Sequence, residues 1–320
     1  MARIVSLGSA LQDIYLIDYD DLAPIEIGNS AIFGKVLVGS KVDIDKISYE
    51  VGGGGVNSAI TFARHGHEAI FMGNIARDPG GMAIVKTLDR EGIDGSFVNY
   101  LEKKSTGTSV VLLDAKSGER TILTYRGASE QFGNFSEKDL DLIQPDWLYV
   151  TTLRGDLDTL ERFFKYAKKS DIKIMFNPGV KELEKVNELT KLLKYVDVLN
   201  VNKSEAARIV PGVMLTELCY HLEGYVGITI ITDGSMGGIA SNGTERYRFG
   251  VYEDVKMRDA TGAGDAFGSG FLAHLTAGHS FRNSLVFASA NSTSVVTKLG
   301  ANKGILHGNE SLHPMPIQKL

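Results

Sequence analysis

The stretch Asp259-Ala260-Thr261-Gly262-Ala263-Gly264-Asp265 decides the fold and the chemistry of this chain. Apolar residues after it recur at the spacing of one helix face, which predicts that a helix begins within the stretch. The first backbone N–H groups of a helix are unpaired and carry the positive end of its dipole. Because Gly262, Ala263 and Gly264 are small, an anion can approach their amides closely, as in a phosphate-binding site. Asp265, one step inside the first turn, would stand beside that anion.

A carboxylate beside bound phosphate can take a proton from a hydroxyl group as it attacks phosphorus. The stretch therefore predicts phosphoryl transfer to an alcohol, with Asp265 as the base. Two other interpretations remain open from these residues alone. One is a glycine-rich turn with a helix-capping Asp, and the other is a dinucleotide fingerprint of an oxidoreductase, formed by Gly262, Gly264 and Gly268. Residues 252–258 are too charged for the buried parallel strand that such a fingerprint follows.

Length and composition describe an ordinary globular chain. Its 320 residues are 43% hydrophobic and 23% charged, enough for one large α/β domain, alone or with a subdomain. The formal net charge of −5, without a basic run, argues against nucleic acid as a partner. A single cysteine, Cys219, fits a reducing compartment. No apolar run reaches the roughly 18 residues of a membrane span, so we expect a cytoplasmic protein with no membrane partner.

Short apolar runs alternate with amphipathic stretches along most of the chain. This alternation predicts a mainly parallel sheet flanked by helices on both faces. The expected strands are 4–7, 69–72, 147–150, 172–176, 196–201 and 228–231, and the expected helices between them are 56–65, 80–91, 157–169, 182–194 and 204–209.

Two segments, 14–50 and 105–126, break this rhythm and are rich in β-branched residues. With turn signals at Gly28-Asn29 and Lys116-Ser117-Gly118, they predict antiparallel strands outside the main sheet. These strands would form a small β-sheet lid across the ligand edge. The expected organisation is an α/β core of residues 1–13, 51–104 and 127–312, a lid of residues 14–50 and 105–126, and a tail, 313–320, within a poorly ordered stretch after Gly308.

A second glycine-rich motif, Gly52-Gly53-Gly54-Gly55-Val56-Asn57, follows an expected strand and opens an expected helix. Four consecutive glycines are costly to order and let a ligand approach closely. We interpret the Gly53 and Gly54 amides and the Asn57 side chain as binding groups for sugar hydroxyls, with a flexible tight turn as the alternative. Asp13, at the expected end of the first strand, would lie at the same ligand edge and could accept two neighbouring hydroxyls.

Two further motifs follow strands of the expected sheet. Asn202 and Glu205 form a helix-capping pattern, and a Glu in this position could also hold water on Mg²⁺. Thr232 and Gly234 lie in a glycine-rich turn, interpreted either as a nucleotide-phosphate site or as a hairpin turn.

Other candidate sites are weaker. His65 and His67 lack Cys or carboxylate partners at ligand spacing, so we interpret them as a solvated helix end that Gly66 terminates. Cys219 has no visible activating base and is interpreted as structural. The sequence has no Gly-x-x-x-x-Gly-Lys-Ser/Thr motif, which excludes a P-loop.

With both glycine motifs in this order, the chain resembles the ribokinase family of PfkB-type carbohydrate kinases from Asp13 to about Asn302. The second family signature is matched by Asp259 through Leu272, and the first by Gly53, Gly54, Asn57, Ala59 and Gly66. Ala76 stands where the family has a glycine, and Ala260 where it usually has Thr or another small β-branched or hydroxyl residue. Neither departure touches the carboxylate or the anion hole.

The resemblance implies a ribokinase-like fold that uses ATP and Mg²⁺. It implies Asp265 as catalytic base, the Gly262–Gly264 amides as anion hole, and acceptor contacts at Asp13, Gly53, Gly54 and Asn57. It links Asn202 and Glu205 to Mg²⁺ and phosphate, Thr232 and Gly234 to the nucleotide turn, and Asn291 to the helix beside adenine. Asp259 and Thr261, with carbonyls near Lys298 and Gly300, match a loop that binds a monovalent cation such as K⁺ in many members.

The expected reaction is transfer of the γ-phosphate of ATP to a hydroxyl of a pentose or hexose. A nucleoside such as adenosine is an alternative that needs an apolar or aromatic wall, for which the candidates are Phe33, Tyr49, Tyr125 and Phe132. A sugar phosphate or carboxylate is another, which Arg126 or Arg154 could grip. A ligand-binding sensor without turnover is a third, against which the intact Asp265 argues. An exposed lid sheet often pairs in relatives, which implies a homodimer through the lid.

Overall fold

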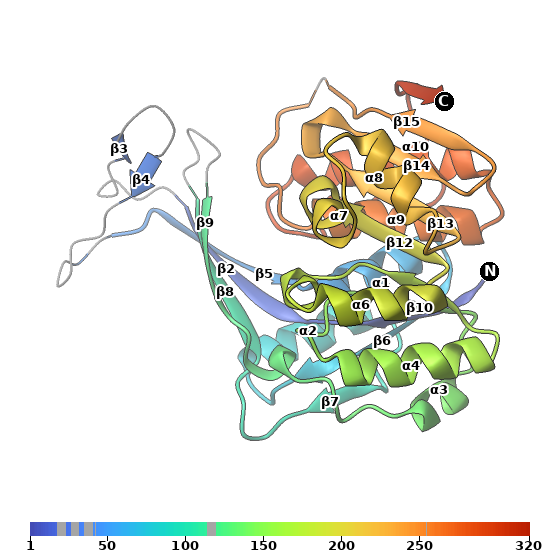
Figure 1. Cartoon of the computed structure of the whole chain (residues 1–320). Helices are drawn as coiled ribbons and strands as arrows, with labels where there is room; N and C mark the ends of the chain where they lie inside the picture. Colours follow the sequence, from blue (N-terminus) through green and yellow to red (C-terminus); the bar gives the residue numbers. More distant parts are fainter. Residues whose placement is uncertain (18–23, 27–31, 35–40, 42, 114–119, 254) are drawn as a thin grey trace.

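A long, mainly parallel sheet covered by helices on both faces forms the body of the molecule (Figure 1). The computed structural model describes residues 1–17, 24–26, 32–34, 41, 43–113, 120–253 and 255–320. In this part of the chain the strand order of the main sheet is β16-β15-β14-β13-β12-β11-β10-β1-β6-β7. No helix in these ranges is long and apolar enough to cross a membrane.

All six expected strands are present. The parallel strands are β1 (Arg3–Leu7), β6 (Glu68–Ile75), β7 (Val98–Tyr100), β10 (Trp147–Val150), β11 (Lys173–Phe176), β12 (Val198–Asn202) and β13 (Ile228–Thr232). Three antiparallel strands extend the sheet beyond β13: β14 (Gly238–Ser241), β15 (Arg246–Phe249) and β16 (Ile317–Lys319). The strand β16 corrects the expectation of a poorly ordered tail, because its backbone pairs with β15.

Each face of the sheet is covered by its own set of helices. One face is covered by α1 (Gly54–Arg64), α2 (Pro79–Arg90), α9 (Ala263–Thr276) and α10 (Phe281–Val296). The other is covered by α3 (Glu137–Ile143), α4 (Leu157–Lys169), α5 (Val180–Leu183), α6 (Val186–Leu192), α7 (Lys203–Ile209) and α8 (Leu215–Leu222). Short 3₁₀ helices follow at η1 (Gly127–Glu130), η2 (Leu193–Tyr195) and η3 (Gly234–Met236).

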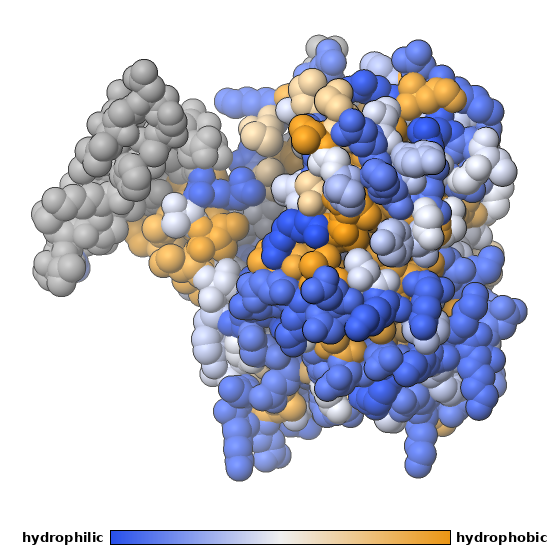
Figure 2. Space-filling model, in the orientation of Figure 1, coloured by the Kyte–Doolittle hydropathy of each residue, from blue (hydrophilic) through white to orange (hydrophobic). Residues whose placement is uncertain are grey.

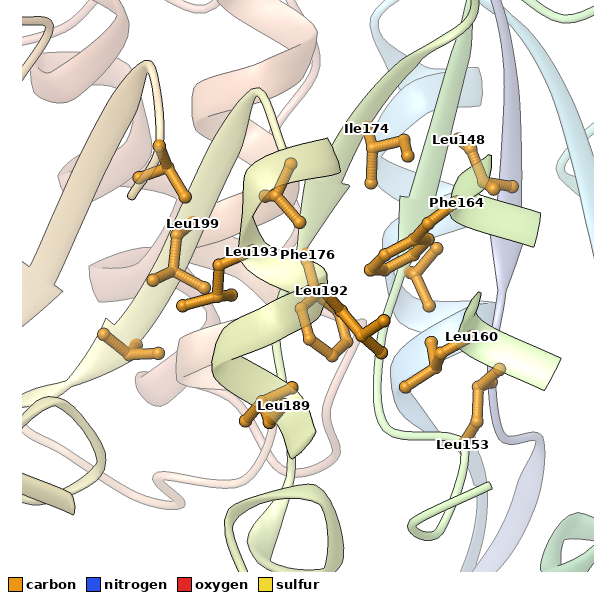
Figure 3. Packing of buried hydrophobic residues seen from close by; sticks show 14 of the residues in the cluster. Leu148, Leu153, Leu160, Phe164, Ile174, Phe176, Leu189, Leu192, Leu193 and Leu199 are labelled. Atoms are coloured by element: carbon orange, nitrogen blue, oxygen red, sulfur yellow. The ribbon is translucent and has the colours of Figure 1, made fainter. Parts of the chain in front are cut away.

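Alternation along the central strands builds the two hydrophobic cores. In β11, Ile174 and Phe176 enter the core under α4 and α6, while Met175 enters the core under α9. Figure 3 shows the first of these cores, where Phe164 and Leu192 lie against the strand side chains. Full burial of each such side chain stabilises the fold by roughly 1.5–3 kcal/mol relative to exposure.

The helix expected at 182–194 is broken into α5, α6 and η2. Glu182 lies in α5, ahead of the break, and its fully buried carboxylate accepts hydrogen bonds from the amides of Leu153, Gly155 and Gly179. The sequence pattern showed an amphipathic stretch but gave no sign of this inward carboxylate.

A second sheet, here called the lid sheet, extends from one side of the body (Figure 1). Its order is β5-β2-β8-β9, with β2 (Leu11–Ile17), β5 (Lys46–Gly52), β8 (Gly107–Leu113) and β9 (Arg120–Tyr125). The strands were expected to be antiparallel, but β2 and β8 run parallel. A separate pair, β3 (Pro24–Glu26) and β4 (Ile32–Gly34), accompanies them. The turn signals at Gly28-Asn29 and Lys116-Ser117-Gly118 lie outside the described residues.

The order of the main sheet reverses beside β1. From β1 the chain continues to β6 on one side and later to β10 on the other, so the crossovers diverge there. Open α/β sheets bind ligands at the carboxyl edge of such a switch point. At that edge the chain leaves β1 through Gly8–Ala10 and enters β2 of the lid sheet.

Candidate active site

The start of α9 presents open backbone amides, as the glycine-rich stretch predicted. Gly262 caps the helix in the left-handed conformation, with φ 79°, and no side chain caps it. Within the described chain the amides of Gly262 and Gly264 form no hydrogen bond, and a Cβ on Gly264 would meet no atom within 4 Å. The Ala263 amide differs from expectation, because it donates to the carbonyl of Ala260 at 3.3 Å. An anion would therefore meet the glycine amides first.

The Asp265 side chain points from α9 toward the start of α1. Its Oδ2 accepts a hydrogen bond of 2.9 Å from Asn57 Nδ2. A Cβ placed on Gly54 would lie 3.1 Å from Asp265 Oδ1, so this glycine leaves the carboxylate room. Burial raises the pKa of Asp265, and the Asn57 hydrogen bond opposes that rise. The structure thus brings the two glycine motifs together at one half-buried carboxylate.

The glycines that open α1 are needed for close packing. Gly53 has φ 95°, and a Cβ there would lie 2.5 Å from the carbonyl oxygen of Ser9. The Gly54 amide, expected to bind a sugar hydroxyl, instead donates to Ser9 Oγ at 3.3 Å. The backbone at Ser9 therefore fills the space that the glycines leave. Sequence reasoning did not identify Ser9 as their partner.

Asp13 lies within β2 of the lid sheet, not at the end of the first strand as expected. It is 3% exposed, and it pairs across the sheet with Glu50 and Ser109. Burial raises the pKa of Asp13 to about 6, a hydrogen bond from Ser109 lowers it, and the negative charges of Asp259 and Glu50 raise it further. Asp13 is therefore a carboxyl group whose charge changes near neutral pH.

The faces of the lid sheet follow from its register. Tyr15, two residues after Asp13, shares the buried face of β2 and donates a hydrogen bond of 2.6 Å to Asp259 Oδ2. The opposite face carries the exposed side chains Ile47, Tyr49, Leu123 and Tyr125. The lid carries an apolar area visible in Figure 2. Tyr49 and Tyr125 thus point away from the Asp13 face.

The candidates for the aromatic wall of a nucleoside site do not line the site where the structure describes their side chains. Tyr49 and Tyr125 lie on the outer face of the lid sheet, and Phe132 is fully buried in the core under α4. Phe33 belongs to β4, but its side chain lies outside the described part of the structure.

Two arginines lie at the junction of the lid sheet and the body. Arg126 precedes η1, and Glu130, at the end of η1, pairs with Arg154 at 3.2 Å. Ser129 of η1 hydrogen-bonds both the amide and the carbonyl of Ala10, which fixes η1 against the start of β2. Arg154 has φ 61°, a conformation that non-glycine residues rarely adopt outside functional or constrained sites.

The predicted nucleotide residues meet at the carboxyl edge of β12 and β13. Asn202 and Thr232 are paired across these strands. Asn202 Oδ1 accepts from the Glu205 amide at 2.9 Å and Glu205 Oε2 accepts from the Asn202 amide at 2.8 Å, so the capping interpretation holds. Burial raises the pKa of Glu205. Gly234 has φ 56° and open space around it.

Asn291 does not face a nucleotide site. Its side chain is fully buried, its Nδ2 donates to the Ala266 carbonyl at 2.8 Å, and its Oδ1 accepts from the Leu306 amide at 2.8 Å. It therefore ties α10 to α9. A cavity of about 280 Å³ lies beside α10 instead, lined by Tyr252, Val255, Ala290, Thr293, Ser294, Thr297, Ser311, Leu312 and His313. No sequence motif indicates this cavity.

The residues expected in a monovalent-cation loop bind each other. The buried Asp259 carboxylate accepts from both the amide and the hydroxyl of Thr261, at 2.9 and 2.6 Å.

Two interpretations of reactive side chains have different outcomes. The expected solvated helix end is wrong, because His67 is buried and its Nε2 lies 2.8 Å from the Ala273 carbonyl. His65 packs edge-on against Phe287 of α10.

Cys219 is buried, and burial raises the pKa of its thiol to about 12, as a structural cysteine requires.

Known proteins of one family are similar to this chain in sequence and in fold. The pfkB family carbohydrate kinases match the chain over residues 1–307. A ribokinase from Haemophilus influenzae is 29% identical over 290 residues, covering 87% of this chain and 90% of that protein. An ATP-dependent 6-phosphofructokinase from Thermoanaerobacterium thermosaccharolyticum is 26% identical, covering 82% and 84%. The solved structure of Arabidopsis thaliana ribokinase with ribose and ATP superimposes with a TM-score of 0.78, at 23% identity and 96% coverage of both chains.

The fold and the site define a phosphotransferase whose acceptor is an alcohol group. The chain belongs to the pfkB family of carbohydrate kinases, the ribokinase family, and it is an ATP-dependent sugar kinase with a ribokinase-like fold.

Proposed function

We propose that this chain transfers the γ-phosphate of ATP to a hydroxyl of a free pentose or hexose, with Asp265 as general base. The observation that supports this most is the position of the Asp265 carboxylate. It lies 2.9 Å from Asn57 at the start of α1, beside the open amides at the start of α9. A hydroxyl between these helices would have a proton acceptor on one side and a phosphate site on the other.

The residues have separate roles in the proposed step. Asp265 takes the proton of the acceptor hydroxyl as that hydroxyl attacks phosphorus, and its raised pKa makes it a stronger proton acceptor than an ordinary carboxylate. The Gly262 and Gly264 amides stabilise negative charge on the transferring group. Asp13 and Asn57 hold the acceptor through its other hydroxyls.

The nucleotide is proposed to lie along the edge from β12 to α10. Asn202, Thr232 and the Gly234 turn lie on the phosphate side, and the cavity beside α10 receives the base. Glu205 fits Mg²⁺ through water, because its Oε2 is used by the Asn202 amide while its Oε1 accepts no hydrogen bond within the described residues. Mg²⁺, when bound, neutralises charge on the phosphates.

A second acceptor class is favoured by Arg126 and Arg154. Arg126 lies near Asp13 and forms no ion pair within the described residues, while Arg154 pairs with Glu130. Burial and then the charge of Arg154 lower the pKa of Arg126, while Glu130 and Asp13 raise it, so these three charged groups each lie close enough to act on Arg126. A guanidinium grips phosphate or carboxylate well, which would make the acceptor a sugar phosphate or sugar acid. A nucleoside is less favoured without a described aromatic wall.

An acceptor panel with ATP and Mg²⁺ tests the proposal. ADP release is measured with neutral pentoses and hexoses, with their phosphates and acids, and with nucleosides. We expect a neutral sugar to give the highest kcat/KM. If a sugar phosphate gives a kcat/KM about tenfold higher or more, and Arg126→Leu abolishes this preference, the acceptor belongs to the second class instead. Release of ADP with none of them would reject the kinase assignment for these acceptors.

Two wider proposals accompany this function. The exposed apolar residues Ile47, Tyr49, Leu123 and Tyr125 favour a homodimer formed through the outer face of the lid sheet. Sedimentation of wild type against Tyr49→Lys tests it, and a monomeric wild type would reject it. ATP as substrate and the buried thiol of Cys219 favour the cytoplasm, which cell fractionation tests.

A further inference from the structure

The Asp259 carboxylate, three residues before the anion hole, is fully buried and fully used by the protein. Besides Thr261, Oδ2 accepts from Tyr15 Oη at 2.6 Å and from the Gly300 amide at 3.3 Å. Arg120 Nε lies 3.4 Å from Oδ1. A carboxylate has about four lone-pair sites, so these groups occupy it.

Both side-chain partners from outside the loop come from the lid sheet. In its register Ile17, Leu113 and Arg120 are aligned across β2, β8 and β9, and Tyr15 lies two residues before Ile17 on the same face. Arg120 and Tyr15 therefore project from one face of the lid sheet onto one carboxylate. No sequence motif indicates this pairing, because 139 positions separate Arg120 from Asp259.

A buried carboxylate requires a compensating positive charge, because an isolated ion inside a protein is strongly destabilised. The family resemblance implies a monovalent cation at Asp259 and Thr261. The Asp259 carboxylate does not fit one, since the Arg120 guanidinium already supplies the charge and both carboxylate oxygens already have partners.

The neighbouring carboxylates, Glu50 and Asp13, also have partners within the protein. Lys303 pairs with Glu50 at 2.5 Å, and Gly300 approaches that same Glu50 side chain. Asp13 has Ser109 and the charge of Arg126. No acid at this junction is left for a metal ion within the described chain, and no cluster of three metal-binding side chains was found there.

We propose that Arg120 is the built-in counter-ion of Asp259, so that phosphoryl transfer by this chain does not depend on a monovalent cation. Arg120 is a positioning residue. It neutralises Asp259, whose oxygen holds the Thr261 amide and thereby the turn that leads into the Gly262 amide. The lid sheet thus carries a charge that maintains the anion hole. This inference rests on the proposed function, but cation binding to the resting protein tests it separately.

The experiment compares K⁺ with choline, as chlorides at about 0.1 M ionic strength. Two quantities are measured for each protein, the thermal unfolding midpoint without substrates and the turnover with ATP, Mg²⁺ and the best acceptor. The proteins are wild type, Arg120→Ala, Arg120→Lys and the control Lys46→Gln. Lys46 lies exposed on the same face of the lid sheet, so its replacement removes a lid charge without touching Asp259.

For wild type, Arg120→Lys and Lys46→Gln we expect the same unfolding midpoint in both salts and turnover rates that differ between the salts by less than about twofold. The positive side chain at position 120 already neutralises Asp259, so no charge is left for K⁺ to neutralise. Arg120→Ala leaves Asp259 uncompensated. In that variant K⁺ should raise the midpoint by about 2 °C or more and turnover by about tenfold, because a ligand of the folded state alone stabilises it.

Two results would overturn the proposal. One is a wild type whose midpoint and turnover both rise with K⁺, because a cation then binds beside Arg120. The other is an Arg120→Ala variant that K⁺ affects in neither measurement. If Arg120→Ala does not fold, the wild type and Arg120→Lys still test whether the protein depends on K⁺. If no acceptor is phosphorylated, the midpoints still test the counter-ion while the proposed function fails.

Discussion

Asn57 Nδ2 donates a hydrogen bond of 2.9 Å to Asp265 Oδ2 across 208 positions of sequence. The bond connects the first turn of α1 with the first turn of α9. It holds the carboxylate between the starts of these two helices. It also stabilises the charged form of Asp265 against the burial that raises its pKa.

Replacement of Asp265 by Asn should remove the general base and leave the shape intact. We expect kcat to fall by about two to four orders of magnitude, the usual span for loss of such a base. ATP should still raise the thermal unfolding midpoint of the variant, because the amides of α9 remain. Turnover near the wild-type level would show that another group accepts the proton.

Replacement of Asn57 by Ala should shift the pH dependence of turnover. The Asn57 hydrogen bond lowers the pKa of Asp265, so its loss raises that pKa. Since Asp265 must be a carboxylate to accept a proton, the acid limb of the kcat profile should move to higher pH. Activity at alkaline pH should recover toward that of wild type. An acid limb at unchanged pH would show that Asn57 does not influence the pKa of Asp265.

Asp13 should control acceptor binding through its charge. Its pKa is raised to about 6, so kcat/KM for the acceptor should fall as pH drops below that value. In Asp13→Asn, kcat/KM for the acceptor should be low and should not change with pH in this region. The same variant should be more stable at pH 7. The folded pKa lies above the unfolded value of 3.8, so the free energy of unfolding decreases as pH rises from about 4 to about 6, by at most about 3 kcal/mol. Equal stability of both proteins at pH 7 would contradict the raised pKa.

Two glycines of one loop should respond differently to the same change. Gly262→Ala places a Cβ at φ 79° and 2.7 Å from the Ala301 Cβ, and the conformation alone costs about 1–2 kcal/mol. Its unfolding midpoint should fall. Gly264→Ala meets open space, so its midpoint should hold while the methyl group obstructs the phosphate and lowers kcat/KM for ATP. Full activity of Gly264→Ala would remove this amide from the anion hole.

The buried histidines should make the fold sensitive to acid. Burial lowers the pKa of His65 and of His274 to about 4, and neighbouring His67, His279 and His307 contribute smaller effects. The folded chain therefore binds protons less readily than the unfolded chain. Stability should be complete above about pH 6.5 and decrease toward pH 4. His274→Phe should weaken that loss in acid denaturation followed by circular dichroism, and an unchanged acid transition would exclude His274 as its source.

Much of the fold could be predicted because short strands and amphipathic helices leave regular patterns. The run 147–150 coincides with β10 and the helix 157–169 with α4. The inward carboxylate of Glu182 could not be predicted, since it is bound by the amides of Leu153 and Gly155, 29 and 27 residues away. The tail was misjudged because β16 is short and gains its order from pairing with β15.

The candidate site shows the same division. Motifs close in sequence, such as the start of α9 and the Asn202–Glu205 cap, could be located from residue types alone. Contacts between distant segments could not. Asn291 matched a family position, yet its amide is used to hold two helices together. Tyr15 could have been found, because strand alternation places it on the face of Asp13, but nothing in its type named Asp259 as partner.

The lid sheet takes its strands from two distant segments, 11–17 with 46–52 and 107–113 with 120–125. Asp13 and Tyr15 come from the first segment and Arg120 from the second. A chimera that exchanged only one segment with a relative would therefore separate the proposed sugar contact, Asp13, from the guanidinium beside Asp259. If both proposals hold, choice of acceptor and independence of K⁺ are inherited together, as a single transplantable unit, only when both segments are exchanged.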